Sequence, residues 1–229
     1  NVKPGQYRTY LAPRAFADVL GMMGWNALSA AAWKQGRSPF KKLVEREARF
    51  SPLLSFSENF GLALTPRFNS QGEVSESLLP LMQAGELRTL LVSSRTAREY
   101  GLTGNAADEG EAPRSLDVAC GSLAERDILK AIGTGLYLSN VHYLNWSDPV
   151  SARVTGMTRY ACFWVENGEI VGPINDLRWD ESLYDALGSR LLPLTDWADI
   201  DPACDTYYTR ALGGSRVPGA LVEGWTFTL

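Results

Sequence analysis

Residues 156–175, GMTRYACFWVENGEIVGPIN, constrain the fold more tightly than any other stretch of this chain. The first part of the stretch predicts a strand with apolar side chains on both faces, and Asn167-Gly168 follows it directly. Asn-Gly tolerates the positive φ angles of a type I′ turn, which joins tightly paired antiparallel strands. Pro173 has no backbone N–H and should end the ladder of the second strand. The stretch therefore predicts a hairpin, and its two apolar faces predict a buried, central position between two layers.

The rest of the chain mixes predicted strands with short helices. Strands are expected at 6–12, 76–83, 87–93, 116–119, 135–143 and 219–228, and helices at 13–33, 94–100, 123–132 and 180–187. Two of the strand pairs are hairpins, and no regular alternation of strand and helix is present. The predicted fold class is therefore α+β, with mainly antiparallel sheets, hairpins and several short helices.

Glycine and proline modify two of these elements. Gly21 and Gly24 fall inside the predicted helix 13–33, where each weakens the helix by about 1 kcal/mol relative to Ala. They indicate either close packing of another backbone or a local kink. Pro80 lies inside the predicted strand 76–83, which should therefore be an edge strand or a bulged strand.

Polar residues predict two helix starts and one loop. Ser122 and Glu125 have the spacing of a capping box at the start of the helix 123–132. Ser94 or Thr96 is a candidate cap for the helix 94–100, which Gly101 should end. The longest loop, residues 102–113, is acidic and is expected to be flexible.

Composition and charge exclude several classes of protein. The 229 residues suffice for a core that needs neither disulfide nor metal. A net charge of −4, with no basic run longer than Lys41-Lys42, argues against general binding to nucleic-acid phosphates. No segment reaches the roughly 18 consecutive apolar residues of a membrane span. The three cysteines form no CxxC motif, so reduced thiols and a cytoplasmic location are expected.

Few residues offer catalysis. The single histidine, His142, would need a carboxylate and a nucleophile nearby to act as a general base; Asp148 and the cysteines are the candidates, but no motif joins them. Cys120 precedes a predicted helix, where a helix dipole would activate a thiol, although a packing role at a tight turn is the simpler interpretation. Cys162 is expected in the core and Cys204 on the surface. A conventional zinc site is not expected.

Two further patterns have structural explanations. The segment 133–135, Gly-Thr-Gly, has the composition of a phosphate-binding loop, but it follows a helix and precedes a strand, the reverse of the order that a phosphate cradle needs. Capping and the helix dipole account for the acidic residues around one predicted helix start, which are Asp176, Asp180, Glu181 and Asp185. No cofactor is expected.

Five motifs together resemble the TldD/PmbA family, whose members are also described as modulators of DNA gyrase or microcin-processing proteases. In this sequence they are FNSQGE (68–73), SRTAREYG (94–101), TGNA (103–106), GTGLYLSN (133–140) and GMTRYACFWVENGEIVGPIN (156–175). No single motif is specific, but their order and spacing are. The resemblance covers about residues 5–229 and implies one C-terminal metallopeptidase-type domain, 1–229. It also implies that the family's N-terminal domain is absent from this sequence.

The resemblance further implies a cytoplasmic bacterial system in which a TldD subunit pairs with a TldE (PmbA) subunit and degrades unfolded peptides. TldD-type chains hold their metal with His-Glu-x-x-x-His on the helix that follows the first strand, and with a later cysteine. Here the six motif positions fall on residues 21–26, where Gly21, Met22 and Asn26 replace His, Glu and His. The resemblance puts Cys204 near the third ligand's position, but alone it makes no site. The chain thus resembles the metal-free TldE/PmbA side.

Three hypotheses follow. The leading one is a metal-free subunit that acts with a TldD-like subunit or by self-association on unfolded peptides, without binding nucleic acid or membrane. The second is a non-catalytic module that binds an extended peptide or gyrase through strand edges. The third is a cysteine hydrolase built on Cys120 and His142.

Overall fold

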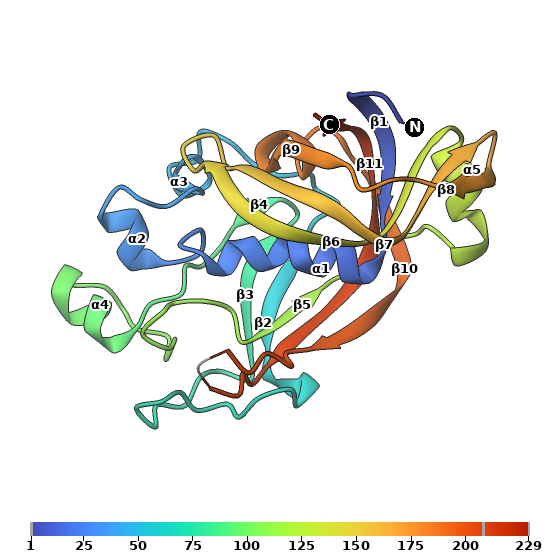
Figure 1. Ribbon diagram of the computed structural model, residues 1–229. Coiled ribbons are helices and arrows are strands. Elements are labelled where there is room, and N and C mark those ends of the chain that lie inside the picture. Colours follow the sequence, from blue (N-terminus) through green and yellow to red (C-terminus); the bar gives the residue numbers. More distant parts are fainter. Residues whose placement is uncertain (1, 208, 229) are drawn as a thin grey trace.

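Eleven strands form one sheet in the computed structural model (Figure 1), which describes residues 2–207 and 209–228. Their bounds are β1 Gly5–Leu11, β2 Phe56–Asn59, β3 Leu78–Gln83, β4 Glu86–Leu87, β5 Ser115–Val118, β6 Gly135–Asp148, β7 Arg153–Glu166, β8 Glu169–Pro173, β9 Arg178–Ser182, β10 Leu191–Pro202 and β11 Gly214–Phe227. The order across the sheet is β1-β6-β7-β9-β11-β5-β2-β3-β4, with β8 added on β7 and β10 on β11. The predicted α+β class is confirmed.

The helices between these strands are short. The α-helices are α1 Pro13–Gly21, α2 Ala30–Lys34, α3 Lys41–Val44, α4 Ser94–Tyr100, α5 Ile128–Ile132 and α6 Leu183–Ala186. Three 3₁₀ turns, η1 Met22–Gly24, η2 Phe60–Leu62 and η3 Glu125–Asp127, extend or connect them. No helix among the described residues has the length and apolar character needed to cross a membrane.

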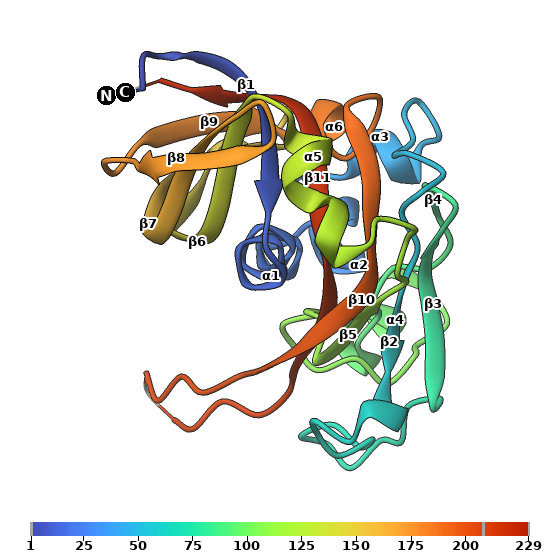
Figure 2. The same ribbon diagram turned by 90° about the vertical axis from the view of Figure 1, so that its right-hand side faces the viewer.

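The sheet curves around α1, the longest helix. Figure 2 looks almost along α1 and shows β6 and β7 on one side of it and β10 and β11 on the other. The apolar stripe predicted from Phe16, Val19, Leu20 and Met23 is almost completely buried there. Burial of each such side chain stabilises the fold by about 1.5–3 kcal/mol. The apolar face of α1 thus lies at the centre of the core. The polar face of α1 lies on the side of the helix that faces away from the core.

Most strand pairs are antiparallel, as predicted. The exceptions are β1 with β6, where Arg8 lies beside Gly135, and β5 with β11. Parallel neighbours need long crossover connections, and here the chain between β1 and β6 includes α1 and the strands β2 to β5. Hairpin signals in the sequence could not indicate these pairings. Pro80 occurs on β3 where β4 does not reach, and a register shift lies beside it, as expected for an edge or bulged strand.

The hairpin predicted at 156–175 is present as β7 and β8. Asn167 and Gly168 both have positive φ, 52° and 81°, as a type I′ turn requires. β8 ends at Pro173.

The predicted burial of this hairpin was wrong. Within the described sheet β8 pairs with β7 only, and its residues Ile170 and Val171 are 49% and 61% exposed. Tyr160, which has a φ of 62°, interrupts the alternation of β7 at a bulge. Apolar residues on both faces therefore indicated a partly solvated edge here, not a second covering layer.

The predicted helix 13–33 is broken in two. α1 ends at Gly21, η1 follows, and α2 starts only at Ala30. A Cβ atom added to Gly21 would meet nothing within 4 Å, so close backbone packing does not explain that glycine. Asn26 has a φ of 72°, which no helix accommodates. The kink was therefore the correct alternative.

Other boundaries also differ from the sequence prediction. Ser122 is not an N-cap, because η3 starts at Glu125 after Ala124. The cap of α4 is Ser93, one residue before the predicted Ser94. Residues 180–182, expected in a helix, belong to β9. β10 was missed altogether.

The loop 102–113 is anchored by a buried carboxylate. Glu111 is 1% exposed. It accepts hydrogen bonds from Ser29 Oγ and Ala31 N at the start of α2, at 2.6 and 2.8 Å. It also accepts from Ser93 N and Oγ at the start of α4, at 2.8 and 2.9 Å. The acidic loop was expected to be flexible, but this residue connects two helix starts.

Candidate functional site

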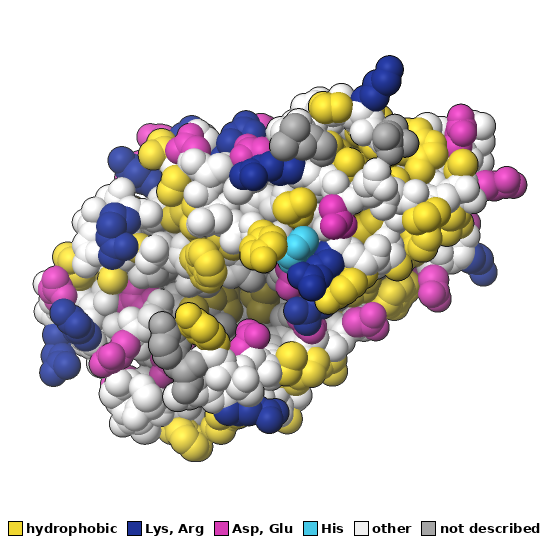
Figure 3. Space-filling model, in the orientation of Figure 1, with side chains coloured by type: hydrophobic (Ala, Val, Ile, Leu, Met, Phe, Trp, Pro, Cys, Tyr) yellow, Lys and Arg dark blue, Asp and Glu magenta, His cyan; other side chains and the backbone are white. Residues whose placement is uncertain are grey.

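A groove of about 950 Å³ runs along the polar face of α1. Residues 140–144 of β6 and 159–160 of β7 form one wall. Residues 201–205, with 212, 214 and 215, form the opposite wall, at the ends of β10 and β11. Figure 3 shows this hollow with the single histidine, in cyan, at its edge. Segments that lie far apart in the sequence therefore line one groove along α1.

The floor of the groove is a stripe of α1. Arg14, Ala17, Asp18 and Gly21 all line it, because residues three and four apart share one side of a helix. Arg14 Nη2 lies 3.3 Å from Asp18 Oδ1, one turn away. Arg14 Nη1 binds the carboxylate of Asp201 at the end of β10. This guanidinium therefore ties the floor to one wall.

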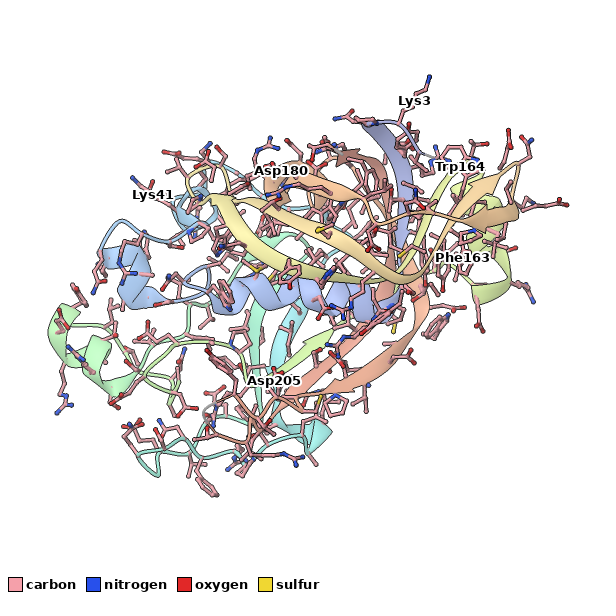
Figure 4. All side chains as sticks on the ribbon, viewed as in Figure 1. Lys3, Lys41, Phe163, Trp164, Asp180 and Asp205 are labelled. Atoms are coloured by element: carbon pink, nitrogen blue, oxygen red, sulfur yellow. The ribbon has the colours of Figure 1, made fainter. Side chains whose placement is uncertain are left out.

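Among the acidic residues of the groove, Asp18 has the largest shift in pKa. Burial raises the pKa of its carboxyl group, Arg14 opposes this, and the negative charges of Asp201 and Asp205 add to it, so that the pKa is about 6. Figure 4 labels Asp205 on the segment between β10 and β11, below α1 in that view. An acid with such a pKa exchanges its proton close to neutral pH, which is a property of many functional carboxylates.

The wall formed by β6 and β7 is basic and aromatic. His142, Tyr143, Arg159 and Tyr160 all line the groove. The Arg159 guanidinium lies over the Tyr160 ring, 4.7 Å from its centroid. The rings of His142 and Tyr143 are 4.6 Å apart. The two tyrosines are 80% and 73% exposed, so this wall offers large aromatic surfaces to a ligand.

On the opposite side, Arg114 is held by its own network. Its guanidinium donates to Phe68 O at 2.9 Å and to Ser75 Oγ at 3.0 Å, and it lies 3.4 Å from Asp108. It also lies over the ring of Phe60. Arg114 thus lines the groove with its charge already neutralised.

The motif positions predicted from the family resemblance are only partly together. Gly21 and Met22 line the groove, whereas Asn26 does not. The six residues 21–26 span the end of α1, η1 and a turn, so they do not present one helical face.

Most other candidate residues lie apart from one another. His142 and Cys204 line the groove, but Cys120 does not. Asp148 is at the far end of β6, where it accepts hydrogen bonds from Ser151 Oγ and Val150 N. Cys162 is buried, as expected. The residues of the proposed cysteine hydrolase are therefore not brought together at the groove.

The donor set of the groove does not fit a catalytic metal. No group of three or more His, Cys, Asp or Glu side chains within residues 2–207 and 209–228 is arranged to hold one. Asp18, the acid on the floor, is paired with a guanidinium, whose positive charge repels a divalent cation.

Sequence reasoning missed Arg14, Asp18, Arg159 and Asp201. The spacing of Arg14 and Asp18 on a predicted helix was a visible signal of an ion pair. Asp201 and Arg159 gave no local signal, since their place in the groove depends on β10 and on the bulge of β7.

Comparison with known proteins identifies the family to which this fold belongs. A family model described as the PmbA/TldA metallopeptidase C-terminal domain matches residues 4–229. The chain belongs to this family. It is 34% identical to Metalloprotease PmbA of Escherichia coli O157:H7 over 128 residues, which cover 55% of this chain and 26% of that protein.

Two crystal structures share the fold over all of this chain. One is TldE from Thermococcus kodakarensis, with a TM-score of 0.80 and 14% identity. The other is a "putative modulator of a DNA gyrase" from Thermotoga maritima MSB8, with a TM-score of 0.78 and 20% identity. This chain spans 51% of each of these two structures.

Proposed function

We propose that this chain is the TldE/PmbA-like, metal-free member of a peptidase system that degrades or processes unfolded peptides. In this proposal it acts with a TldD-like subunit that holds the metal, or with a second copy of itself. The observation that supports it most directly is the floor of the groove, where the motif positions Gly21 and Met22 offer no metal ligand and the nearby acid Asp18 is paired with Arg14.

Physical chemistry supports the metal-free assignment. A hydrolytic metal site needs several ligands with lone pairs directed at one point, and an open position for water. In this groove a guanidinium occupies the helix face and bridges two carboxylates, Asp18 and Asp201. Binding of a cation there would require both ion pairs to break. In this proposal the groove receives a peptide chain and does not activate water.

The expected ligand and cellular location of the protein follow from its composition and its family. The net charge of −4 disfavours general binding to nucleic-acid phosphates. Reduced cysteines are in keeping with a cytoplasmic location. Peptide, not nucleic acid or membrane, is the proposed ligand.

The test combines partner and metal analysis. Tagged full-length protein is purified from its host, co-purifying proteins are identified by mass spectrometry, and metal is measured on the complex and on the isolated chain. We expect a TldD-like partner or a homo-oligomer, metal below one-tenth of stoichiometric on the isolated chain, and peptidase activity only in the complex. Stoichiometric zinc on the isolated chain, with peptidase activity that is lost on chelation, would overturn the proposal.

A second candidate function is a stand-alone module that binds an extended peptide or gyrase. The observation in its favour is β8, which pairs with β7 alone within the described sheet and exposes Ile170 and Val171. Such an edge can accept an added strand. Recovery of gyrase subunits without a TldD-like partner in the same purification would favour this alternative.

A further inference from the structure

The β6–β7 wall of the groove contains two matching pairs of residues. Each pair is a basic side chain followed by a tyrosine: His142 with Tyr143, and Arg159 with Tyr160. In both pairs the basic group contacts the ring that follows it, at 4.6 Å between ring centroids and at 4.7 Å from guanidinium carbon to centroid. The same arrangement thus occurs on two neighbouring strands of one wall.

Both tyrosines stand in strained backbone. Tyr143 has a φ of 55° and Tyr160 a φ of 62°, and the register of β6 with β7 shifts beside each of them. A non-glycine residue in this region costs about 1–3 kcal/mol, and such strain gathers at functional sites. β-bulges also redirect the side chains of a strand, and they are frequent next to binding sites. Two such bulges in one wall indicate that the wall is shaped for a ligand.

The two basic groups of this wall lack the partners that the other groove arginines have. Arg14 binds Asp18 and Asp201, and Arg114 lies beside Asp108. The Arg159 guanidinium makes no hydrogen bond or ion pair with any described residue, although the Arg159 backbone carbonyl accepts from Ser139 Oγ and Cys162 Sγ. The imidazole of His142 likewise makes no hydrogen bond to the described part of the chain, and Nδ1 is its solvent-shielded ring nitrogen without a partner. Its Nε2 remains to donate into the groove.

Their placement suits one anion. In the β6–β7 ladder Arg159 lies opposite Asn140, and His142 is two residues farther along the same strand without a bulge between them. The two side chains are therefore diagonal neighbours on one face, with Cα atoms about 7 Å apart. A carboxylate placed between them can accept from the guanidinium fork with one or both oxygens. The acidic opposite wall at Asp201 and Asp205 repels a phosphate dianion more strongly than a carboxylate, because the dianion carries more negative charge.

We propose that His142 and Arg159, flanked by the rings of Tyr143 and Tyr160, form a carboxylate-binding subsite for an extended peptide in the groove. The carboxylate is either the C-terminus of the peptide or an Asp or Glu side chain. The exposed tyrosine rings hold the apolar side chains next to it, and the acidic wall sets the direction of the chain. The peptide nature of the ligand rests on the proposed function; the carboxylate preference rests on this wall alone.

Fluorescence anisotropy with three labelled peptides tests the subsite on the full-length protein. The probes are fluorescein-Ala-Leu-Ala-Leu-Ala with a free C-terminus, the same peptide as its C-terminal amide, and an amide with Glu as its fourth residue. We expect at least one carboxylate probe to bind about tenfold more tightly than the neutral amide. Whichever of the two does so identifies the source of the carboxylate.

Three substitutions test whether the carboxylate preference depends on Arg159 and His142. Arg159→Gln should remove the preference for the carboxylate and leave the affinity for the neutral amide unchanged, and His142→Gln should reduce the preference about threefold. Arg126→Gln is the charge-matched control, because Arg126 is an exposed arginine outside the groove. It should keep the full preference.

Three results would overturn the subsite: equal binding of all probes, no binding of any, or the same loss in Arg126→Gln as in Arg159→Gln. None of them bears on the metal-free pairing, which partner recovery and metal content of the same preparation report. Conversely, zinc on the isolated chain would overturn the proposed function and leave the carboxylate preference standing.

Discussion

Glu111 is buried and Asp18 is partly buried, and the surroundings of the two carboxylates differ. Glu111, in the loop between α4 and β5, accepts four hydrogen bonds from Ser29, Ala31 and Ser93. Asp18, on the floor of the groove, has one cationic neighbour, Arg14, and lies near two further carboxylates. Desolvation destabilises both charged carboxylates, but only for Glu111 do hydrogen-bond donors compensate for the lost water. The ionised carboxylate of Glu111 therefore stabilises the fold, whereas that of Asp18 does not.

Their proton affinities move in opposite directions. Burial alone would raise the pKa of Glu111, but the hydrogen bonds from Ser29, Thr96 and the backbone bring it below the usual value. Burial raises the pKa of Asp18 to about 6, and Arg14 does not compensate. A group with a lowered pKa stabilises the folded state when ionised, and a group with a raised pKa destabilises it when ionised.

The largest effect is expected for Glu111→Ala. The substitution leaves buried N–H and hydroxyl donors without an acceptor at the starts of α2 and α4, so the free energy of unfolding should fall by about 3 kcal/mol or more. Urea unfolding at neutral pH measures it. Glu109→Ala, an exposed residue of the same loop, is the control and should change stability by less than about 0.5 kcal/mol. Equal effects of the two substitutions would contradict the role of Glu111.

A smaller effect of opposite sign is expected for Asp18→Asn. At pH 7.5 the wild-type carboxylate is ionised in a site that disfavours its charge, so the variant should be more stable by about 1 kcal/mol. Because the folded pKa of about 6 exceeds the usual 3.8, the wild type binds its proton more readily when folded. Its stability should therefore rise relative to the variant as the pH falls from about 7 toward 4.5.

Glu111 gives a pH dependence of the opposite sign, which the wild type and Asp18→Asn share. Its folded pKa lies below the usual 4.5, so its contribution is complete above pH 4.5 and is lost as the pH falls further. Unfolding curves at pH 7.5, 6, 5 and 4 measure both trends. An Asp18→Asn variant that is less stable than the wild type at pH 7.5 would mean that the ion pair with Arg14 outweighs the burial of Asp18.

Ser93→Ala tests the helix start that Glu111 supports. Ser93 Oγ accepts from Thr96 N at 3.3 Å and caps α4, and loss of such a cap costs about 1 kcal/mol. The matched comparison is Ser122→Ala, because Ser122 has the sequence pattern of a cap but lies two residues before Ala124, the residue that precedes η3. No measurable change is expected there. Destabilisation by both substitutions to the same extent would show that Ser122 caps its helix in solution.

Local signals predicted the parts of the fold that depend on neighbouring residues. The Asn167-Gly168 turn, the end of α4 at Gly101 and the end of α5 at Gly133 all rest on backbone angles that few residues adopt. What failed depends on distant contacts. β10 gains its place by pairing with β11, and β8 pairs with β7 alone within the described sheet, with Ile170 and Val171 exposed.

The residues of the groove show the same difference between local and distant contacts. Gly21 and Met22 were placed by family resemblance, and they do line it. Arg14 and Asp18 are one helical turn apart, so their pairing was predictable in principle. The ion pair of Arg14 with Asp201 joins residues 187 positions apart in the chain, and no periodicity reports such a contact. Arg159 faces the groove beside a bulge that the regular alternation of β7 concealed.

The smallest expected effect compares strain in the groove wall with an ordinary strand. Tyr143 has a φ of 55°, which glycine adopts without penalty, so Tyr143→Gly should stabilise the fold by about 0.5 kcal/mol while it removes an aromatic surface from the groove. Ile200→Gly, at an exposed position of β10 outside the positive-φ residues, should instead destabilise by about 0.5–1 kcal/mol. Opposite signs in urea unfolding, with weaker binding of the leucine-containing peptides only in Tyr143→Gly, would mean that the strain is retained for binding. Destabilisation by both would mean that the Tyr143 ring contributes more packing than its backbone angle costs.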